Sequence, residues 1–199
     1  MRPEGKLALG YFPLPDAEAS NLAKMLAIPE GKPITALDPC AGTGKTLLDI
    51  TQASSSCTRY AVEIDARRAR ECASNGITTL HSRRRLRNHV DGVLQPSLRH
   101  RCSYFPHRGR LESVFLDSIT EWLAPGGLLV FVVPHYTLNS CITRSSTAYE
   151  NIRIYRLSAP DSLLYKQVVV FAVRKKISQY KDYAIDALVQ SIRQIVCGR

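Results

Sequence analysis

One segment, Leu37–Gly44 (LDPCAGTG), constrains the fold of this chain more than any other. It follows a short apolar run, residues 33–37, and precedes a helix-like segment, residues 45–51. Glycine has no Cβ and tolerates positive φ, so a turn with two glycines lets a ligand approach the backbone closely. The pattern predicts a strand, a glycine turn and a helix, with the turn at the carboxyl end of the strand.

A second strand is predicted over residues 59–64, where an apolar run ends in acidic residues. Glu63 stands 21 residues after Gly42 and is followed by Asp65. An acidic residue about 20 residues beyond a glycine turn can accept hydrogen bonds from the hydroxyl groups of a ribose. The two segments together predict a nucleoside-bearing cofactor at the carboxyl ends of two adjacent parallel strands. Two roles stay open for Asp65: the N-cap of a helix that begins at Ala66, which we favour, and a second ribose ligand.

Strand-like and helix-like segments alternate along the chain, which is typical of a doubly wound α/β sheet. Further helices are predicted over residues 17–27, 66–74, 111–123 and 175–196, and further strands over 77–81, 128–133, 151–157 and 167–174. The run 128–133 is apolar throughout, as expected for a central strand covered on both faces, and residues 124–127 (APGG) predict a sharp turn before it. We assign residues 1–176 to one domain and residues 177–199 to a C-terminal helix.

The composition argues against several other classes of protein. The 199 residues are 45% hydrophobic, with no apolar run near the length of about 20 residues that spans a bilayer. The first residues contain no apolar segment typical of signal peptides, so we predict a cytoplasmic protein without a membrane partner. The six cysteines are scattered without a C-x-x-C pair, so we predict no metal site and interpret Cys40 as a small residue of the turn, not a nucleophile.

Positive charge is concentrated in residues 83–110. This segment holds eight arginines and one acidic residue, Asp91, and so carries +7 of the chain's net charge of +10. A strongly basic balance favours a nucleic-acid partner, and the run 83–85 could bind phosphates. A solvated basic loop is the simpler interpretation. We recognise no strand between residues 81 and 111.

With these motifs in place, the chain resembles the class I (Rossmann-type) S-adenosylmethionine-dependent methyltransferases. Residues 38–44 are similar to the first cofactor motif of that superfamily, and Glu63 stands where those enzymes hold the ribose. Residues 122–128 (WLAPGGL) are similar to their turn before the fifth strand. Residues 10–15 (GYFPLP) are similar to a motif of amino-methyltransferases that act on adenine. The chain is most similar to an uncharacterised bacterial methyltransferase-like family with G-Y-x-P-x-P and D-P-C-A-G motifs.

The resemblance implies the rest of the fold and the ligands. It implies a single, mostly parallel sheet with helices on both faces and a C-terminal antiparallel hairpin. It also implies S-adenosyl-L-methionine as the cofactor and adenine in DNA as a partner. The cofactor-binding residues implied are Tyr11, Phe12, Asp38, Pro39, Ala41, Gly42, Gly44 and Glu63. Tyr11 and Phe12 have the alternative role of packing the N-terminal segment on the core.

One motif of the amino-methyltransferases is missing. Those enzymes carry N/D/S-P-P-Y/F after their fourth strand, where it receives the target amine and stacks on the flipped base. The nearest fragment here is Ser103–Pro106 (SYFP), a poor match inside the basic segment, so we assign no catalytic residue. Translation of residues 83–110 out of frame would explain both the charge and the missing motif, and a diverged basic loop is the alternative hypothesis.

Three functions therefore remain open. The first is methyl transfer from S-adenosylmethionine, with N6 of adenine as the expected acceptor. The second is a non-catalytic module of the same fold that binds the cofactor or nucleic acid. The third, remote alternative is a P-loop NTPase, because residues 42–46 (GTGKT) match the end of that motif, although Pro39 stands where its first glycine is required. His135, after the apolar strand, is a weaker candidate for a substrate contact.

Overall fold

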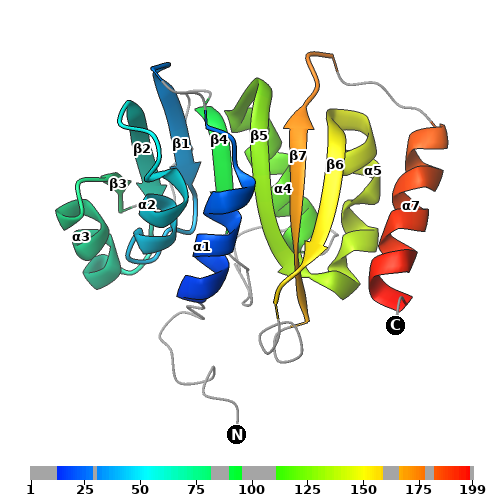
Figure 1. Ribbon diagram of the computed structural model, residues 1–199, viewed down its shortest axis with the longest axis horizontal. Helices are drawn as coiled ribbons and strands as arrows, with labels where there is room; N and C mark the ends of the chain where they lie inside the picture. Colours follow the sequence, from blue (N-terminus) through cyan, green and yellow to red (C-terminus); the bar gives the residue numbers. More distant parts are fainter. Residues whose placement is uncertain are drawn as a thin grey trace, which may run out of the picture.

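The computed structural model describes residues 13–28, 31–81, 90–95, 111–158, 166–177 and 182–197. Its centre is one seven-stranded sheet in the order β3-β2-β1-β4-β5-β7-β6 (Figure 1). All neighbouring strands are parallel except β7, which runs antiparallel to both β5 and β6. The strands are β1 Ile34–Asp38, β2 Cys57–Val62, β3 Thr78–Leu80, β4 Val90–Gln95, β5 Leu123–Pro134, β6 Tyr149–Arg156 and β7 Gln167–Arg174.

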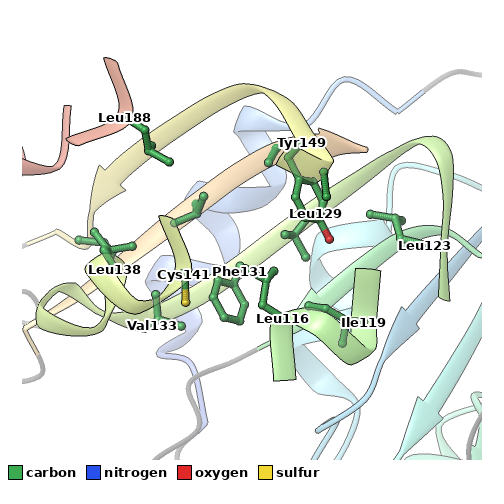
Figure 2. Packing of buried hydrophobic residues seen from close by; sticks show 14 of the residues in the cluster. Leu116, Ile119, Leu123, Leu129, Phe131, Val133, Leu138, Cys141, Tyr149 and Leu188 are labelled. Carbon is green, nitrogen blue, oxygen red and sulfur yellow. The ribbon is translucent and has the colours of Figure 1, made fainter. Parts of the chain in front are cut away.

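Helices cover both faces of the sheet, and each face has its own apolar core. The helices are α1 Asp16–Met25, α2 Lys45–Thr51, α3 Ala66–Ser74, α4 Leu111–Trp122, α5 Leu138–Ala148 and α7 Asp182–Cys197. One core joins α1, α2 and α3 to the sheet, and the other joins α4, α5 and α7 to it. Figure 2 shows the second core, where Leu116 of α4 lies beside Phe131 of β5. The doubly wound fold and its C-terminal antiparallel hairpin are confirmed.

The glycine turn lies where the strand order reverses. Strand β1 pairs with β2 on one side and with β4 on the other, and the chain leaves the sheet at Asp38. In open α/β sheets this switch point opens a crevice outside the carboxyl ends of the strands, where ligands bind. The fold therefore positions the predicted cofactor turn at the expected edge.

The expectation that residues 83–110 contain no strand is wrong. Strand β4, Val90–Gln95, lies between β1 and β5, with Gly92 paired to both Ala36 and Leu128. The strand is short and contains Asp91 and Gly92, which are depleted in strands, so the local sequence pattern conceals it. Because this strand is present, its apparent absence from the sequence no longer supports the out-of-frame hypothesis. The remaining support for that hypothesis is the concentration of positive charge and the absent N/D/S-P-P-Y/F motif. Residues 82–89 and 96–110 lie outside the described residues.

Three further local predictions differ from the structure. Helix α5 is absent from the predicted elements, because its sequence LNSCITRSSTA is rich in Ser and Thr, which are weak helix formers. The predicted turn at 124–127 is a bulge inside β5, whose register to β4 shifts between the pairs Val90–Leu123 and Gly92–Leu128. Residues 175–177 are not helical, so the last helix begins after its predicted start.

Candidate functional site

The structure brings the two acidic strand ends predicted from the sequence together. Asp38 ends β1 beside Ala61 of β2, and Glu63 follows β2 directly. The turn is joined to the second strand end by a direct hydrogen bond, in which the Gly42 backbone N–H donates to Glu63 Oε2 at 2.8 Å. Gly42 has a φ of 58°, in the left-handed region that glycine adopts readily. The positive φ at Gly42 therefore lets the turn reach the acid of the neighbouring strand.

Asp38 is the most perturbed group of the site. Its side chain is fully buried, and Oδ1 accepts a hydrogen bond from the Cys40 backbone N–H at 2.9 Å. Oδ2 has no hydrogen-bond partner among the described residues. Burial raises the pKa of Asp38 to about 8, the Cys40 amide opposes this shift, and the charge of Glu63 adds to it. A buried carboxylate oxygen without a donor is suited to a cationic or hydrogen-bonding ligand.

Other backbone amides of the turn donate within the protein. Ala41 N–H donates to Val62 O at 3.1 Å and Gly44 N–H to Ala41 O at 2.8 Å. Lys45 does not point across the turn, since its Nζ binds Asp16 at 2.7 Å and Asp49 at 2.9 Å. A P-loop needs its amides and its lysine for phosphate. These bonds argue against the NTPase alternative.

Glu63 is enclosed by donors that its spacing from the glycine turn does not predict. Oε1 accepts from the Asp65 backbone N–H at 2.8 Å and from Arg68 Nη2 at 3.1 Å, and the residue is buried. Asp65 caps α3, as predicted, by accepting from the Arg68 backbone N–H at 2.9 Å. The same bond lowers the pKa of Asp65. The only sequence signal for Arg68 is its position three residues after a capping acid.

The Cβ position of Gly44 faces the protein's own core. Its φ is +80°, and a Cβ there would lie 2.4 Å from Ile77 Cδ1 and 2.7 Å from Cys72 Sγ. The absent side chain thus leaves room for Ile77 and for Cys72 of α3, and the role of Gly44 in binding the cofactor stays a prediction.

The remaining candidates lie at the same edge or outside the described residues. Pro39 and Ala41 are buried within the turn, beside Asp38. His135 follows β5, and its ring Nδ1 lies 3.1 Å from the Lys166 carbonyl oxygen. Tyr11 and Phe12 fall outside the described residues, so their role stays a prediction.

Comparison with known proteins supplies a family. The profile described as "Uncharacterised methyltransferase family (DUF6094)" matches residues 2–190 of the chain. A search of curated proteins finds no match. Within the described residues no cluster of His, Cys, Asp or Glu could hold a metal ion, and no helix is long and apolar enough to cross a membrane.

Solved structures of low sequence identity share the fold. An S-adenosylmethionine-dependent O-methyltransferase from Thermotoga maritima matches with a TM-score of 0.61 and 15% identity, over 85% of this chain and 68% of that one. A predicted O-methyltransferase from Agrobacterium tumefaciens matches with a TM-score of 0.58 and 13% identity, over 88% of this chain and 96% of that one. The ribosomal protein L11 methylase from Lactobacillus delbrueckii subsp. bulgaricus matches with a TM-score of 0.54 and 14% identity, over 79% of this chain and 77% of that one. The family and the shared fold imply S-adenosylmethionine as the cofactor.

Proposed function

The chain belongs to the DUF6094 methyltransferase family, and from that premise we propose that it transfers the methyl group of S-adenosylmethionine to an amine of a nucleic-acid base. Adenine in DNA is the acceptor that the N-terminal motif, residues 10–15, favours. The observation that carries the cofactor assignment is the buried Oδ2 of Asp38, which has no hydrogen-bond partner among the described residues, at the switch point of the sheet.

The residues present fit this cofactor. Asp38 Oδ2 is a buried carboxyl oxygen without a partner among the described residues. The ammonium of the methionine moiety would favour the ionised form of Asp38, whose Oδ2 would then accept from it, directly or through water. Glu63 Oε2 lies at the same turn and suits a ribose hydroxyl. When bound, the cofactor supplies a methyl group already activated on a sulfonium, so positioning provides most of the rate. In this proposal the residues of the chain hold, orient and shield the reacting groups from water.

A basic and aromatic rim at the same edge of the sheet as the glycine turn supports a nucleic-acid acceptor. We define this rim as His135, Tyr136, Arg156 and Lys166. Strand β6 ends at Arg156, β5 ends just before His135, and β7 begins just after Lys166, so the pairing places all four at one edge. Tyr136, Arg156 and Lys166 are exposed. The His135 ring packs edge-to-face against the Tyr136 ring, with 5.9 Å between the two ring centroids.

The electrostatics of this rim suit a phosphate. Burial lowers the pKa of His135, and the nearby charges of Arg156 and Lys166 lower it further, so the ring is neutral at pH 7. Because both cations act on the same ring, an anion beside His135 would be attracted by both charges. Cations combined with an exposed aromatic ring are typical of surfaces that bind single-stranded nucleic acid.

The test of the cofactor is binding of S-adenosylhomocysteine, measured by calorimetry. We expect binding to the folded chain and a loss of about tenfold or more in Glu63→Ala, because a hydrogen bond to a charged group is worth about 1.5–3 kcal/mol. The matched control is Glu71→Ala, an exposed acid on α3, which should bind like the wild type. Equal affinity of the wild type and Glu63→Ala would remove Glu63 from the site. ATP binding without a response to S-adenosylhomocysteine would restore the NTPase alternative.

The test of the acceptor is methyl transfer to single-stranded and duplex DNA with and without adenine. We expect binding of oligonucleotides to weaken in the double variant Arg156→Ala/Lys166→Ala, with a salt slope reduced by about 0.7 per lost phosphate contact. Arg153→Ala, an exposed arginine elsewhere on β6, is the control. Unchanged DNA binding in the double variant would separate this rim from the substrate.

The missing N/D/S-P-P-Y/F motif favours one second candidate, a module that binds the cofactor without catalysis. It predicts S-adenosylhomocysteine binding without methyl transfer to any of these DNA substrates. Robust adenine methylation by the unmodified chain would exclude it.

A further inference from the structure

The carboxylate proposed to hold the ribose is already in contact with three donors of the protein. Glu63 Oε2 accepts from Gly42 N–H at 2.8 Å, while Oε1 accepts from Asp65 N–H at 2.8 Å and Arg68 Nη2 at 3.1 Å. A carboxylate offers about four lone-pair sites, two on each oxygen. Both sites of Oε1 are therefore used, and the remaining one belongs to Oε2, on the side of the glycine turn.

Arg68 is an unusual residue for so buried a position. Its side chain and that of Glu63 are only 5% and 6% exposed, so both charges are withdrawn from water. A buried ion pair generally adds little stability compared with apolar residues of the same volume. The cap of α3 brings a second carboxylate near the guanidinium, because Asp65 Oδ1 accepts from the Arg68 backbone N–H and Asp65 Oδ2 lies 3.9 Å from Arg68 Nη1. A helix start and a buried cation thus act together to orient one carboxylate.

We propose that Arg68 is a positioning residue for the cofactor. By donating to Oε1 of Glu63, Arg68 leaves Oε2 as the single acceptor for a ribose hydroxyl. This inference rests on the proposed function. The contact to the ribose is then one hydrogen bond beside Gly42 and not a two-oxygen grip. Without the guanidinium the carboxylate can rotate, and its preference for a ribose hydroxyl at that place is lost.

The experiment compares the affinity for S-adenosylhomocysteine with that for its 2′-deoxy and 3′-deoxy counterparts, by calorimetry. The wild type should bind S-adenosylhomocysteine about tenfold more tightly than the analogue that lacks the contacting hydroxyl, as expected for one charge-assisted hydrogen bond. In Arg68→Met this ratio should fall to about twofold or less. Arg68→Lys, which retains a cation able to reach Oε1, should restore part of the ratio. Arg70→Met, an exposed arginine of the same helix, should behave as the wild type.

A double variant separates positioning from a purely structural role. If Arg68 acts through Glu63, then Arg68→Met should have little further effect on the affinity ratio when Glu63→Gln is already present. Equal weakening of all three ligands in Arg68→Met, with the wild-type ratio retained, would overturn the inference and leave the proposed function intact. If Arg68→Met does not fold, Arg68→Lys takes its place. The inference would then be overturned if Arg68→Lys retains the wild-type affinity ratio and if the losses of affinity add in the double variant Arg68→Lys/Glu63→Gln. Failure of the wild type to bind any of the ligands would instead refute the proposed function and this inference with it.

Discussion

Replacing Asp38 with Asn is expected to stabilise the cofactor-free protein at alkaline pH and to lose this advantage as the pH falls. Asp38 is fully buried, and its Oδ2 has no partner among the described residues, so burial raises its pKa from 3.8 to about 8. Above this value the folded chain carries an ionised carboxylate that would be better solvated after unfolding. Asn keeps the shape and the acceptor for the Cys40 amide but carries no charge.

The magnitude follows from the size of the pKa shift. One pKa unit corresponds to about 1.4 kcal/mol, so the ionised Asp38 destabilises the folded chain by about 6 kcal/mol above pH 8. The side-chain amide introduced by Asp38→Asn would lack an acceptor, which costs about 1–3 kcal/mol. A net gain of a few kcal/mol should therefore remain in the variant at pH 9.

The direction of the pH dependence is fixed by proton binding. Between pH 4 and pH 8, the limits set by the two pKa values, folded Asp38 holds a proton that the unfolded chain has released, so the contribution of this group to stability falls as the pH rises. The amide in the variant does not titrate and has no such dependence. The stability of Asp38→Asn relative to the wild type should therefore increase by up to about 1.4 kcal/mol per pH unit in this window and then level off.

The assay is urea unfolding of both proteins without cofactor, from pH 5 to pH 9. Subtracting the wild-type free energy at each pH removes the contributions of the other titrating groups. The control is Asp49→Asn, a partly exposed carboxylate of α2 paired with exposed Lys45, which should change stability by less than about 1 kcal/mol without a slope. A difference between Asp38→Asn and the wild type that is constant from pH 5 to 9 would refute the reasoning.

Three further predictions test other parts of the fold. Gly44→Ala should destabilise more than Gly76→Ala by about 1–3 kcal/mol in urea unfolding, because both glycines have φ near +80° but only at Gly44 would a Cβ meet core atoms; equal losses would contradict this. Tyr149→Phe should lower the free energy of unfolding by about 1 kcal/mol, because the buried hydroxyl of Tyr149 bonds to a threonine hydroxyl of α4 at 2.8 Å. Burial raises the pKa of Tyr149 to about 12, so this loss of stability should not vary from pH 5 to 9. Burial raises the pKa of Cys141 to about 11, so iodoacetamide should alkylate Cys141 more slowly than the partly exposed Cys57. Peptide mapping by mass spectrometry measures both rates, and the difference between them should disappear in urea.

The first half of the fold could be predicted from the sequence because several local signals agree there. Helix α3 begins and ends as expected, since Asp65 caps it and Asn75-Gly76 follow it. Helix α5 could not be predicted from its composition. Its Ser and Thr hydroxyls bond to carbonyl oxygens of preceding residues, as Thr147 does to Thr143 at 2.8 Å, and burial of Leu138 and its neighbours stabilises the helix instead. Tertiary packing overrides weak propensity in that segment.

The candidate site could be predicted only as a set of residue types at strand ends. Asp38, Gly42 and Glu63 each lie at the edge that the sequence predicts, because parallel strands bring their carboxyl ends together. Spacing alone does not tell which atoms remain available to a ligand, since that depends on donors from other elements. Arg68 uses Oε1 of Glu63 from α3, whereas no described residue donates to Oδ2 of Asp38. The unpartnered oxygen of Asp38 is therefore the best structural evidence for a ligand at this edge, and the glycine turn is evidence mainly for the fold that positions it.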